Sequence, residues 1–270
     1  MAEVLNVTVN GISMDYCRFG TGDKIFVILP GLSIQSVMGS ADAVEEGYKI
    51  FAEEYTTYLF DRRKNLPSEY SIHDMAGDTA EAIKALGLKD IYLFGASQGG
   101  MIAMTIAIEH PELVKKMVLG STSSCVQPKQ QAAVDAWIDL ARRKEKKELY
   151  QNFGKIIYPP EVYAQYEDYF AEVSKTVEDS DLERFIILAG SIRDFNVTSE
   201  LVKIDCPTLL LGVYEDAVLD DDATMAIAEK LDYRQDFQLF MYKGYGHAAF
   251  DTAPDYRQRI YDFFQLNNGK

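Results

Sequence analysis

The spacing of hydrophobic and polar residues changes several times along this chain. Residues 3–9 alternate between apolar and polar side chains, and after Asn10-Gly11 residues 12–19 continue as a second strand-like run. Asn-Gly between two such runs is typical of a β-hairpin. Later runs are short and mostly apolar, as in strands that are buried on both faces of a sheet. These runs predict strands at residues 24–29, 55–60, 91–94, 117–120, 206–212 and 237–242.

Segments with helical spacing lie between these apolar runs. Helices are expected at residues 41–53, 71–86, 101–109, 222–231 and 254–266. Strands that alternate with helices form parallel βαβ units. The pattern therefore predicts an α/β fold, in which a mostly parallel central sheet has an N-terminal antiparallel hairpin and helices on both faces.

The alternation stops after Cys125. The residues from Gln127 to Phe195 contain no strand-like run, and their spacing favours helices. The expected helices cover residues 129–152, 160–175 and 179–193, and the basic run Arg142–Lys147 is expected to form a solvated face of the first one. We therefore predict an α/β core and an all-helical cap over the carboxyl edge of the sheet. The core comprises residues 1–125 and 196–270, and the cap comprises residues 126–195.

Composition narrows the class of protein. The chain of 270 residues has a formal net charge of −15 at pH 7, which argues against nucleic acid and anionic membrane surfaces as partners. No apolar run approaches the ~20 residues that cross a bilayer, and the N-terminus lacks the pattern of a signal peptide. The three cysteines are far apart, as free thiols in a reducing compartment are. We therefore expect a cytoplasmic protein, and the oligomeric state stays open.

The strongest chemical motif lies in residues 91–100. The buried strand Ile91–Phe94 leads into Gly95-Ala96-Ser97-Gln98-Gly99, a G-x-S-x-G sequence, and a helical segment follows from Met101. A serine at such a tight turn projects its hydroxyl clear of the sheet, and the glycines on either side remove Cβ atoms that would clash. This context predicts Ser97 as a nucleophile.

A serine hydroxyl needs a base within hydrogen-bond reach, and the base needs an orienting acid. The chain has three histidines. His247 follows a strand in a glycine-containing loop, where open α/β sheets place their functional sites, so it is the predicted base. His110 precedes a proline at a helix end and His73 lies in the first turn of a helix, so structural roles are expected for both.

The loop after the strand at residues 206–212 supplies candidates for the acid. Asp216 is the first aspartate after this strand, and apolar residues follow it. Asp216 is therefore favoured, and Glu215 is a competing candidate. Asp220–Asp222 lie where the N-cap and first turn of a helix favour carboxylates. The expected order along the chain is then Ser, Asp and His.

A tetrahedral oxyanion needs two preorganised hydrogen-bond donors. The backbone N–H of Gln98, at the start of a helix, is one candidate. Pro30-Gly31 ends the first buried strand and places the N–H of Leu32 as the second candidate. The alternative is that Pro30-Gly31 is only a turn that ends the strand.

These features together resemble the α/β-hydrolase superfamily, in particular its members with a helical cap. The resemblance covers nearly the whole chain. The matching stretches are residues 58–63, 95–100, 212–218, 244–247 and 254–264. The resemblance implies that Ser97 is the nucleophile, His247 the base and Asp216 the acid. It also implies that the backbone amides of Leu32 and Gln98 form the oxyanion hole.

Two departures from the superfamily pattern stand out. Pro30-Gly31 takes the place of the usual His-Gly before the oxyanion residue, and Arg63 and Lys64 replace a glycine-rich continuation after Asp61-Arg62. We expect the charges of Arg63 and Lys64 to lie in a solvated loop, and the role of Arg62 stays open. The alternative is a carboxylate-binding site for an acidic substrate.

The resulting hypothesis is a serine hydrolase that needs no cofactor or metal and acts on a small carboxylic ester or related acyl compound. Carbon–carbon hydrolysis, lactone hydrolysis and pyruvate elimination are alternatives on the same fold, and a non-catalytic ligand-binding protein is an alternative of another class. Aromatic residues of the cap suggest an apolar acyl pocket, although for most of them packing within the cap is the favoured role. They are Trp137, Phe153, Tyr158, Tyr163, Tyr166, Tyr169, Phe170 and Phe185.

Overall fold

The computed structural model describes residues 2–266, apart from the side chain of Asp221. Its centre is an eight-stranded sheet in the order β1-β2-β4-β3-β5-β6-β7-β8. The strands are β1 (Glu3–Val9), β2 (Ile12–Phe19), β3 (Lys24–Leu29), β4 (Tyr55–Arg63), β5 (Ile91–Ala96), β6 (Val114–Gly120), β7 (Thr208–Val213) and β8 (Phe237–Tyr242). The β1–β2 and β2–β4 pairs are antiparallel and the other pairs are parallel, which confirms the predicted fold class.

The N-terminal hairpin follows from its turn. Asn10 and Gly11 have φ angles of 52° and 78°, and Val9 pairs with Ile12 on the other strand. Two consecutive positive φ angles fit a two-residue hairpin turn, whose twist matches that of the strands. This antiparallel pair covers the edge of the sheet on the side of β4.

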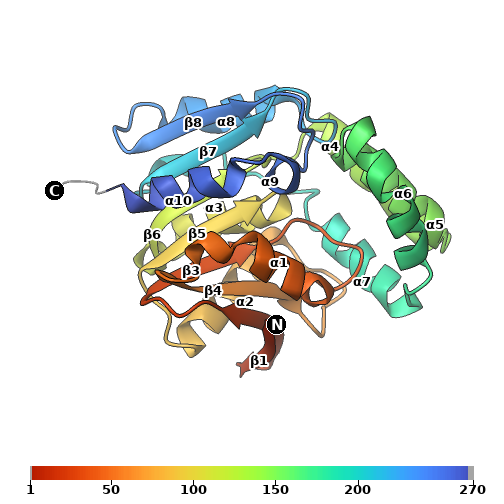
Figure 1. Ribbon diagram of the computed structural model, residues 1–270, viewed down its shortest axis with the longest axis horizontal. Coiled ribbons are helices and arrows are strands. Elements are labelled where there is room, and N and C mark those ends of the chain that lie inside the picture. The colour runs from red at the N-terminus through yellow and green to blue at the C-terminus, as the bar shows by residue number, and fades with distance from the viewer. Residues whose placement is uncertain (1, 267–270) are drawn as a thin grey trace.

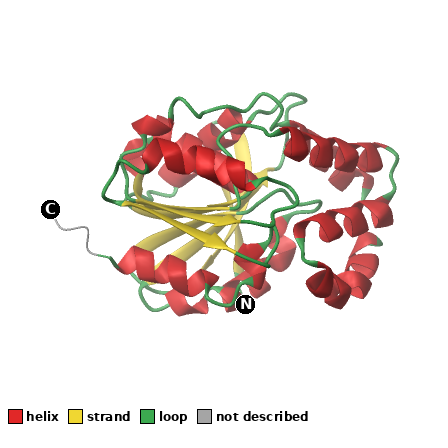
Figure 2. Ribbon diagram, turned by 90° about the horizontal axis from the view of Figure 1, so that it is seen from above, coloured by secondary structure: helices red, strands yellow, loops and turns green. Residues whose placement is uncertain are grey.

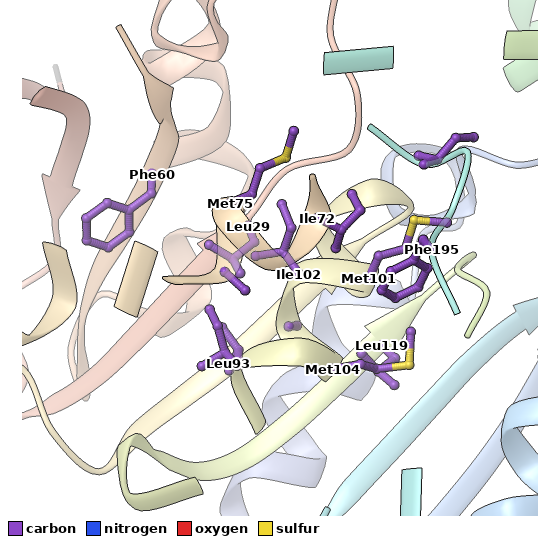
Figure 3. Packing of buried hydrophobic residues seen from close by; sticks show 14 of the residues in the cluster. Leu29, Phe60, Ile72, Met75, Leu93, Met101, Ile102, Met104, Leu119 and Phe195 are labelled. Atoms are coloured by element: carbon purple, nitrogen blue, oxygen red, sulfur yellow. The ribbon is translucent and has the colours of Figure 1, made fainter. Parts of the chain in front are cut away.

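Helices cover both faces of the sheet (Figure 2). One face is covered by α2 (Ile72–Ala85), α3 (Gln98–Glu109) and α8 (Asp221–Leu231). The other face is covered by α1 (Ala41–Gly47) and α10 (Tyr256–Gln265), and the short helix α9 (Ala249–Thr252) comes before α10. Each face of the sheet carries its own cluster of buried hydrophobic residues, and side chains along β3 alternate between them. Val27 and Leu29 pack on the face of α2 and α3, and Phe26 packs on the face of α1 and α10. In Figure 3, Leu29 and Leu93 of the sheet lie close to Ile102 of α3 and Met75 of α2.

Strand β4 is longer than predicted. The predicted end at Phe60 is wrong, because β4 pairs with β2 as far as Arg63, whose partner is Met14. This pairing carries the Asp61-Arg62 dipeptide into the sheet, where both side chains are buried. The expected solvated loop is therefore wrong for Arg63, which is half-buried as the last residue of β4, whereas Lys64 is exposed.

Four helices lie between β6 and β7: α4 (Pro128–Arg142), α5 (Lys146–Ile157), α6 (Pro160–Ser174) and α7 (Asp179–Gly190). They form a separate layer at one end of the sheet, on the right of Figure 1. The chain leaves and re-enters the α/β part at an isolated bridge between Cys125 and Asn196. Two hydrogen bonds flank this bridge, from Val126 N to Phe195 O (3.1 Å) and from Val197 N to Ser124 O (2.8 Å).

The predicted single helix over residues 129–152 is wrong, because it is broken after Arg142. Lys144 has a φ of 59°, Glu145 N donates to Leu140 O and Lys144 N donates to Ala141 O, each at 3.0 Å. This pair of bonds is a Schellman motif, a common helix ending in which glycine usually takes the left-handed position. Lysine takes that position here, which hid the break in the sequence. The basic run therefore spans an interhelical turn, and Arg142–Lys144 are solvated as expected.

Within residues 2–266, no helix combines the length and the apolar character that crossing a membrane requires.

Candidate active site

Ser97 lies in the turn between β5 and α3. Its φ and ψ are 53° and −121°, a strained conformation for a residue with a side chain. Two hydrogen bonds hold the turn: Ser97 N donates to Gly120 O (2.8 Å), and Thr122 Oγ1 donates to Ser97 O (2.7 Å). Residues of β6 and the loop after it thus fix the backbone of the predicted nucleophile.

The glycines around Ser97 are required by close backbone contacts. A Cβ atom on Gly99 would lie 2.0 Å from Leu29 O, and one on Gly95 would lie 2.3 Å from Gly99 O. Neither carbonyl is free to move, because one ends the central strand β3 and the other belongs to the first turn of α3. The G-x-S-x-G pattern therefore has a steric cause in this structure.

His247 lies between Ser97 and Asp216. Its Nε2 is 2.9 Å from Ser97 Oγ, and its Nδ1 is 2.7 Å from Asp216 Oδ2. The side chains of His247 and Asp216 are buried, whereas Ser97 is partly exposed. The positive φ of Gly246 (65°) turns the loop after β8 so that the imidazole faces the Ser97 turn.

The carboxylate of Asp216 is fixed by its own loop. Asp216 Oδ1 accepts hydrogen bonds from the amides of Val218 and Leu219, both at 2.8 Å. Glu215, the competing candidate, is exposed, and its Oε2 accepts a bond from Gly244 N (2.7 Å). The geometry therefore places Asp216, and not Glu215, on the imidazole of His247.

The other two histidines contact surface groups. His73 Nδ1 is 2.7 Å from Glu109 Oε1, and His110 Nδ1 is 3.2 Å from Lys84 Nζ. Both contacts tie α2 to the end of α3, as expected for structural roles.

The two residues that carry the predicted oxyanion donors lie near Ser97. Gln98 is the first residue of α3, so its amide has no acceptor within the helix. The loop that holds Leu32 passes close to the turn, because a Cβ atom on Gly31 would be 3.2 Å from Ser97 Cβ. Leu32, Ser97, Gln98 and His247 line the same cavity.

This cavity has a volume of about 710 Å³, within the usual range for small-molecule sites. Its walls come from the loop after β3 and from the helices between β6 and β7. Five of the eight aromatic residues that the sequence singled out line it: Trp137, Phe153, Tyr158, Tyr169 and Phe170. Side chains for which packing was the favoured role therefore also line the cavity, while they contact other rings of the same helical layer.

The cavity lining contains two carboxylate side chains besides the imidazole of His247. They are Asp181 and Asp251, and no lysine or arginine of the described chain is among the lining residues. Lys129, at the nearby start of α4, donates to Asp216 O (2.8 Å) and to Asp220 Oδ1 (2.7 Å). The cavity therefore lacks the cationic partner that a carboxylate substrate would need.

Sequence reasoning missed one buried polar group beside the cavity. The guanidinium of Arg62, 5% exposed, donates from Nη2 to Pro30 O (2.7 Å) and to Gln98 Oε1 (3.4 Å). Burial lowers the pKa of Arg62 to about 10, although nearby Asp61 opposes the shift, so the group stays charged at neutral pH. The Asp61-Arg62 match to the superfamily was the available signal, but nothing local indicated burial.

Asp61 joins this group to the helical layer. Its Oδ1 accepts bonds from Arg184 Nη2 of α7 (2.6 Å) and from Arg62 N (2.7 Å), and its Oδ2 accepts one from Ser36 Oγ (2.5 Å). Gln98 makes a second connection, because its Nε2 donates to Leu188 O (2.7 Å). The end of β4, the Ser97 turn and α7 are therefore linked by buried hydrogen bonds.

Metal ligation has no support in residues 2–266. No group of three or more histidine, cysteine, aspartate or glutamate side chains there is arranged to hold a metal ion. The three cysteines are all free thiols.

Known proteins resemble this chain in sequence and in fold. A family model described as the alpha/beta hydrolase fold matches residues 24–144. The serine hydrolase BPHL of Mus musculus is 25% identical over 225 residues, which cover 79% of this chain and 70% of that protein. The RutD protein of Caulobacter segnis, whose name assigns it provisionally to carbamate hydrolysis, is 24% identical over 255 residues, covering 90% of this chain and 93% of RutD.

Among solved structures, an α/β hydrolase enzyme from a Medee basin deep-sea metagenome library superposes with a TM-score of 0.86. The two chains are 22% identical, and the match covers 98% of this chain and 99% of the other. At this identity the likeness shows a common fold. It extends over the four helices between β6 and β7 as well as the sheet, because almost all of this chain is covered.

Proposed function

We propose that the chain belongs to the α/β-hydrolase superfamily of enzymes and that it is a serine hydrolase that uses no cofactor. The observation that carries this proposal is the hydrogen-bonded series Asp216–His247–Ser97, whose His247 and Ser97 line the cavity. A protein that only binds ligands does not need a base that is oriented toward a serine in a strained backbone conformation. This argues against the alternative of a non-catalytic binding protein.

The proposed reaction has two stages. Ser97 Oγ attacks an acyl carbonyl while His247 Nε2 accepts the hydroxyl proton, and Asp216 stabilises the resulting imidazolium. The oxyanion of the tetrahedral intermediate accepts hydrogen bonds from the amides of Leu32 and Gln98. His247 then protonates the leaving group, and water, activated by the same imidazole, hydrolyses the acyl-enzyme and regenerates Ser97.

The cavity favours an uncharged substrate with an apolar acyl group. Aromatic side chains from residues 126–195 cover the cavity, and we propose that this segment acts as a cap that selects the acyl group. A carboxylic ester is the simplest substrate of this kind, and lactones and carbamates are related acyl compounds. Pyruvate elimination is less well supported, because its substrate carries a carboxylate and the cavity lining offers it no cation.

The test is a fluorophosphonate probe together with a panel of p-nitrophenyl esters of increasing acyl length, a lactone and a carbamate. We expect the wild type to be labelled once and to hydrolyse one class with a clear optimum in acyl length. Ser97→Ala should lose both labelling and turnover. Ser124→Ala is the matched control, since Ser124 Oγ bonds to Thr198 Oγ1 outside the reacting groups.

Turnover by Ser97→Ala at the wild-type rate would contradict the proposal. Binding of panel compounds without labelling or turnover of the wild type would favour the binding-protein alternative instead.

A further inference from the structure

The Arg62 guanidinium is a buried cation whose hydrogen bonds go to the two parts of the predicted oxyanion hole. Both bonds leave from Nη2, one to Pro30 O and one to Gln98 Oε1, while Nε is buried without a hydrogen-bond partner. Burying a charge is costly unless its hydrogen bonds compensate. Because one nitrogen of this buried arginine has no hydrogen-bond partner, packing alone does not explain why an arginine occupies the position.

A simple ion pair with Asp61 is not that explanation. The hydrogen bonds to the Asp61 carboxylate come from Arg184 Nη2, Ser36 Oγ and the backbone N of Arg62. The Arg62 guanidinium faces the loop after β3 and the Ser97 turn instead. Asp61 thus supplies a nearby negative charge, and the directional bonds of Arg62 are made elsewhere.

The Pro30 carbonyl lies one peptide before the amide of Leu32. Residues 30–33 lie outside helices and strands, so no ladder of backbone bonds holds them. Between the Pro30 carbonyl and the Leu32 amide lies only Gly31, whose backbone is permissive. Anchoring the carbonyl at 2.7 Å fixes the peptide plane from which the chain continues to Leu32.

The contact with Gln98 anchors the other side of the hole. Gln98 Oε1 accepts from Arg62, and Gln98 Nε2 donates to Leu188 O (2.7 Å) and Ser191 Oγ (3.2 Å). The side chain is held at both ends, which restrains the residue whose amide is the second predicted donor. One guanidinium therefore contacts both the loop that carries one predicted donor and the side chain of the residue that carries the other.

We propose that Arg62 is a positioning residue, which holds Pro30 and Gln98 so that the amides of Leu32 and Gln98 converge on one oxyanion. This inference rests on the proposed function. The pre-formed arrangement matters because oxyanion donors lower the barrier only when they need no reorganisation during the reaction. Arg62 touches neither substrate nor reacting atoms in this scheme.

The test compares Arg62→Met with Arg63→Met, using the best ester from the panel. Losing one oxyanion donor costs about 10²–10³-fold in kcat, so loosening two donors in Arg62→Met should cost about 10- to 100-fold. KM should stay within about twofold, because the hole acts in the transition state. Arg63→Met is the matched control, since Arg63 is next along β4 but pairs with Asp78 (3.3 Å).

A second readout separates positioning from general damage. A trifluoromethyl ketone forms a tetrahedral adduct with the serine, and its affinity for Arg62→Met should fall in parallel with kcat/KM. The acid limb of the pH profile of kcat should not move, because the His247–Asp216 pair is untouched. If Arg62→Met does not fold, Arg62→Lys keeps the charge, but its ammonium lacks the planar fork and should lower kcat about 3- to 10-fold.

The inference would be overturned if folded Arg62→Met kept the wild-type kcat and the wild-type affinity for the ketone. If only Arg62→Lys folds, the same result in that variant would overturn it. Equal losses in Arg62→Met and Arg63→Met would also overturn it. If the wild-type turnover did not depend on Ser97, the proposed function itself would fail. If it depended on Ser97 but not on Arg62, only the positioning role would fail.

Discussion

The two walls of the cavity are built in different ways. On the sheet side, hydrogen bonds that involve the backbone hold two of the predicted functional residues: Gly120 O and Thr122 Oγ1 bond to the backbone of Ser97, and two amides bond to the carboxylate of Asp216. On the side of α4–α7, aromatic rings face one another. Phe170, for example, has ring-centroid distances of 6.1 Å to Tyr158 and 6.0 Å to Tyr163.

This difference separates two tasks. Backbone contacts tolerate almost no change in geometry, which suits groups that must stay aligned for bond making and breaking. Aromatic side chains can rotate and exchange contacts, which suits a surface that accommodates different acyl groups. We therefore expect substitutions on the sheet side to reduce kcat or folding, and substitutions in residues 126–195 to change KM and selectivity.

The largest effect is expected for Asp216→Asn. An asparagine at this position favours the wrong tautomer of His247, which should lower kcat by about 10⁴-fold with little change in stability. Steady-state kinetics with the best ester, together with thermal unfolding, measures both effects.

Glu215→Gln is the control for this variant. Glu215 is exposed and its bond is to Gly244 N, so kcat should stay within about threefold of wild type. A large loss in Glu215→Gln with normal turnover in Asp216→Asn would transfer the role of the acid to the neighbouring residue.

The next largest effect is a loss of folding stability, which we compare for one glycine on the sheet side and one on the side of α4–α7. The Cβ of Gly99→Ala would lie 2.0 Å from Leu29 O, a backbone atom of the central strand β3. Because this carbonyl cannot move aside, we expect unfolding in urea to show a loss of about 3 kcal/mol or more.

The matched substitution is Gly154→Ala in α5. Its Cβ would meet Phe170 Cε2 at 2.7 Å, but a ring edge can rotate, and alanine favours the helix over glycine. The net change should lie within about 1 kcal/mol. Equal losses in the two variants would show that the two walls are equally rigid.

Local patterns predicted the parts of the molecule whose geometry has a local cause. The hairpin follows from Asn10-Gly11, and the Ser97 turn follows from its glycines and the apolar strand before it. The three residues of the Asp216–His247–Ser97 series come from separate loops. They were predictable because each follows an apolar strand and because parallel strands bring their carboxyl ends to the same edge of a sheet.

The parts that the sequence concealed depend on distant residues. The burial of Arg62 depends on acceptors 32 and 36 residues away along the chain, at Pro30 and Gln98. The helix break at Lys144 lacks the glycine that usually marks it. The aromatic residues between positions 126 and 195 have the same spacing whether they face a cavity or pack together, so only the three-dimensional arrangement of α4–α6 separates the two roles.

The smallest expected effect is a difference in cysteine alkylation rate. It tests the bridge between Cys125 and Asn196, where the helices α4–α7 join the sheet side. Burial raises the pKa of Cys17 to about 11 and that of Cys206 to about 12, and both thiols lie inside the core. At pH 8 their thiolate fractions are therefore on the order of 10⁻³ or less, and the thiolate is the species that reacts. Cys125 is partly exposed at the bridge to Asn196.

Iodoacetamide at pH 8 should therefore alkylate Cys125 at least ~100-fold faster than the other two thiols, as a time course by peptide mass spectrometry will measure. Cys125→Ser should remove the fast phase, and in denaturant all three thiols of the wild type should react at similar rates. Raising the pH from 7 to 9 should leave Cys17 and Cys206 slow, because both pKa values lie above this range. Fast alkylation of Cys206 in the native protein would mean that the core opens as readily as the junction, and the contrast between the two walls would then fail.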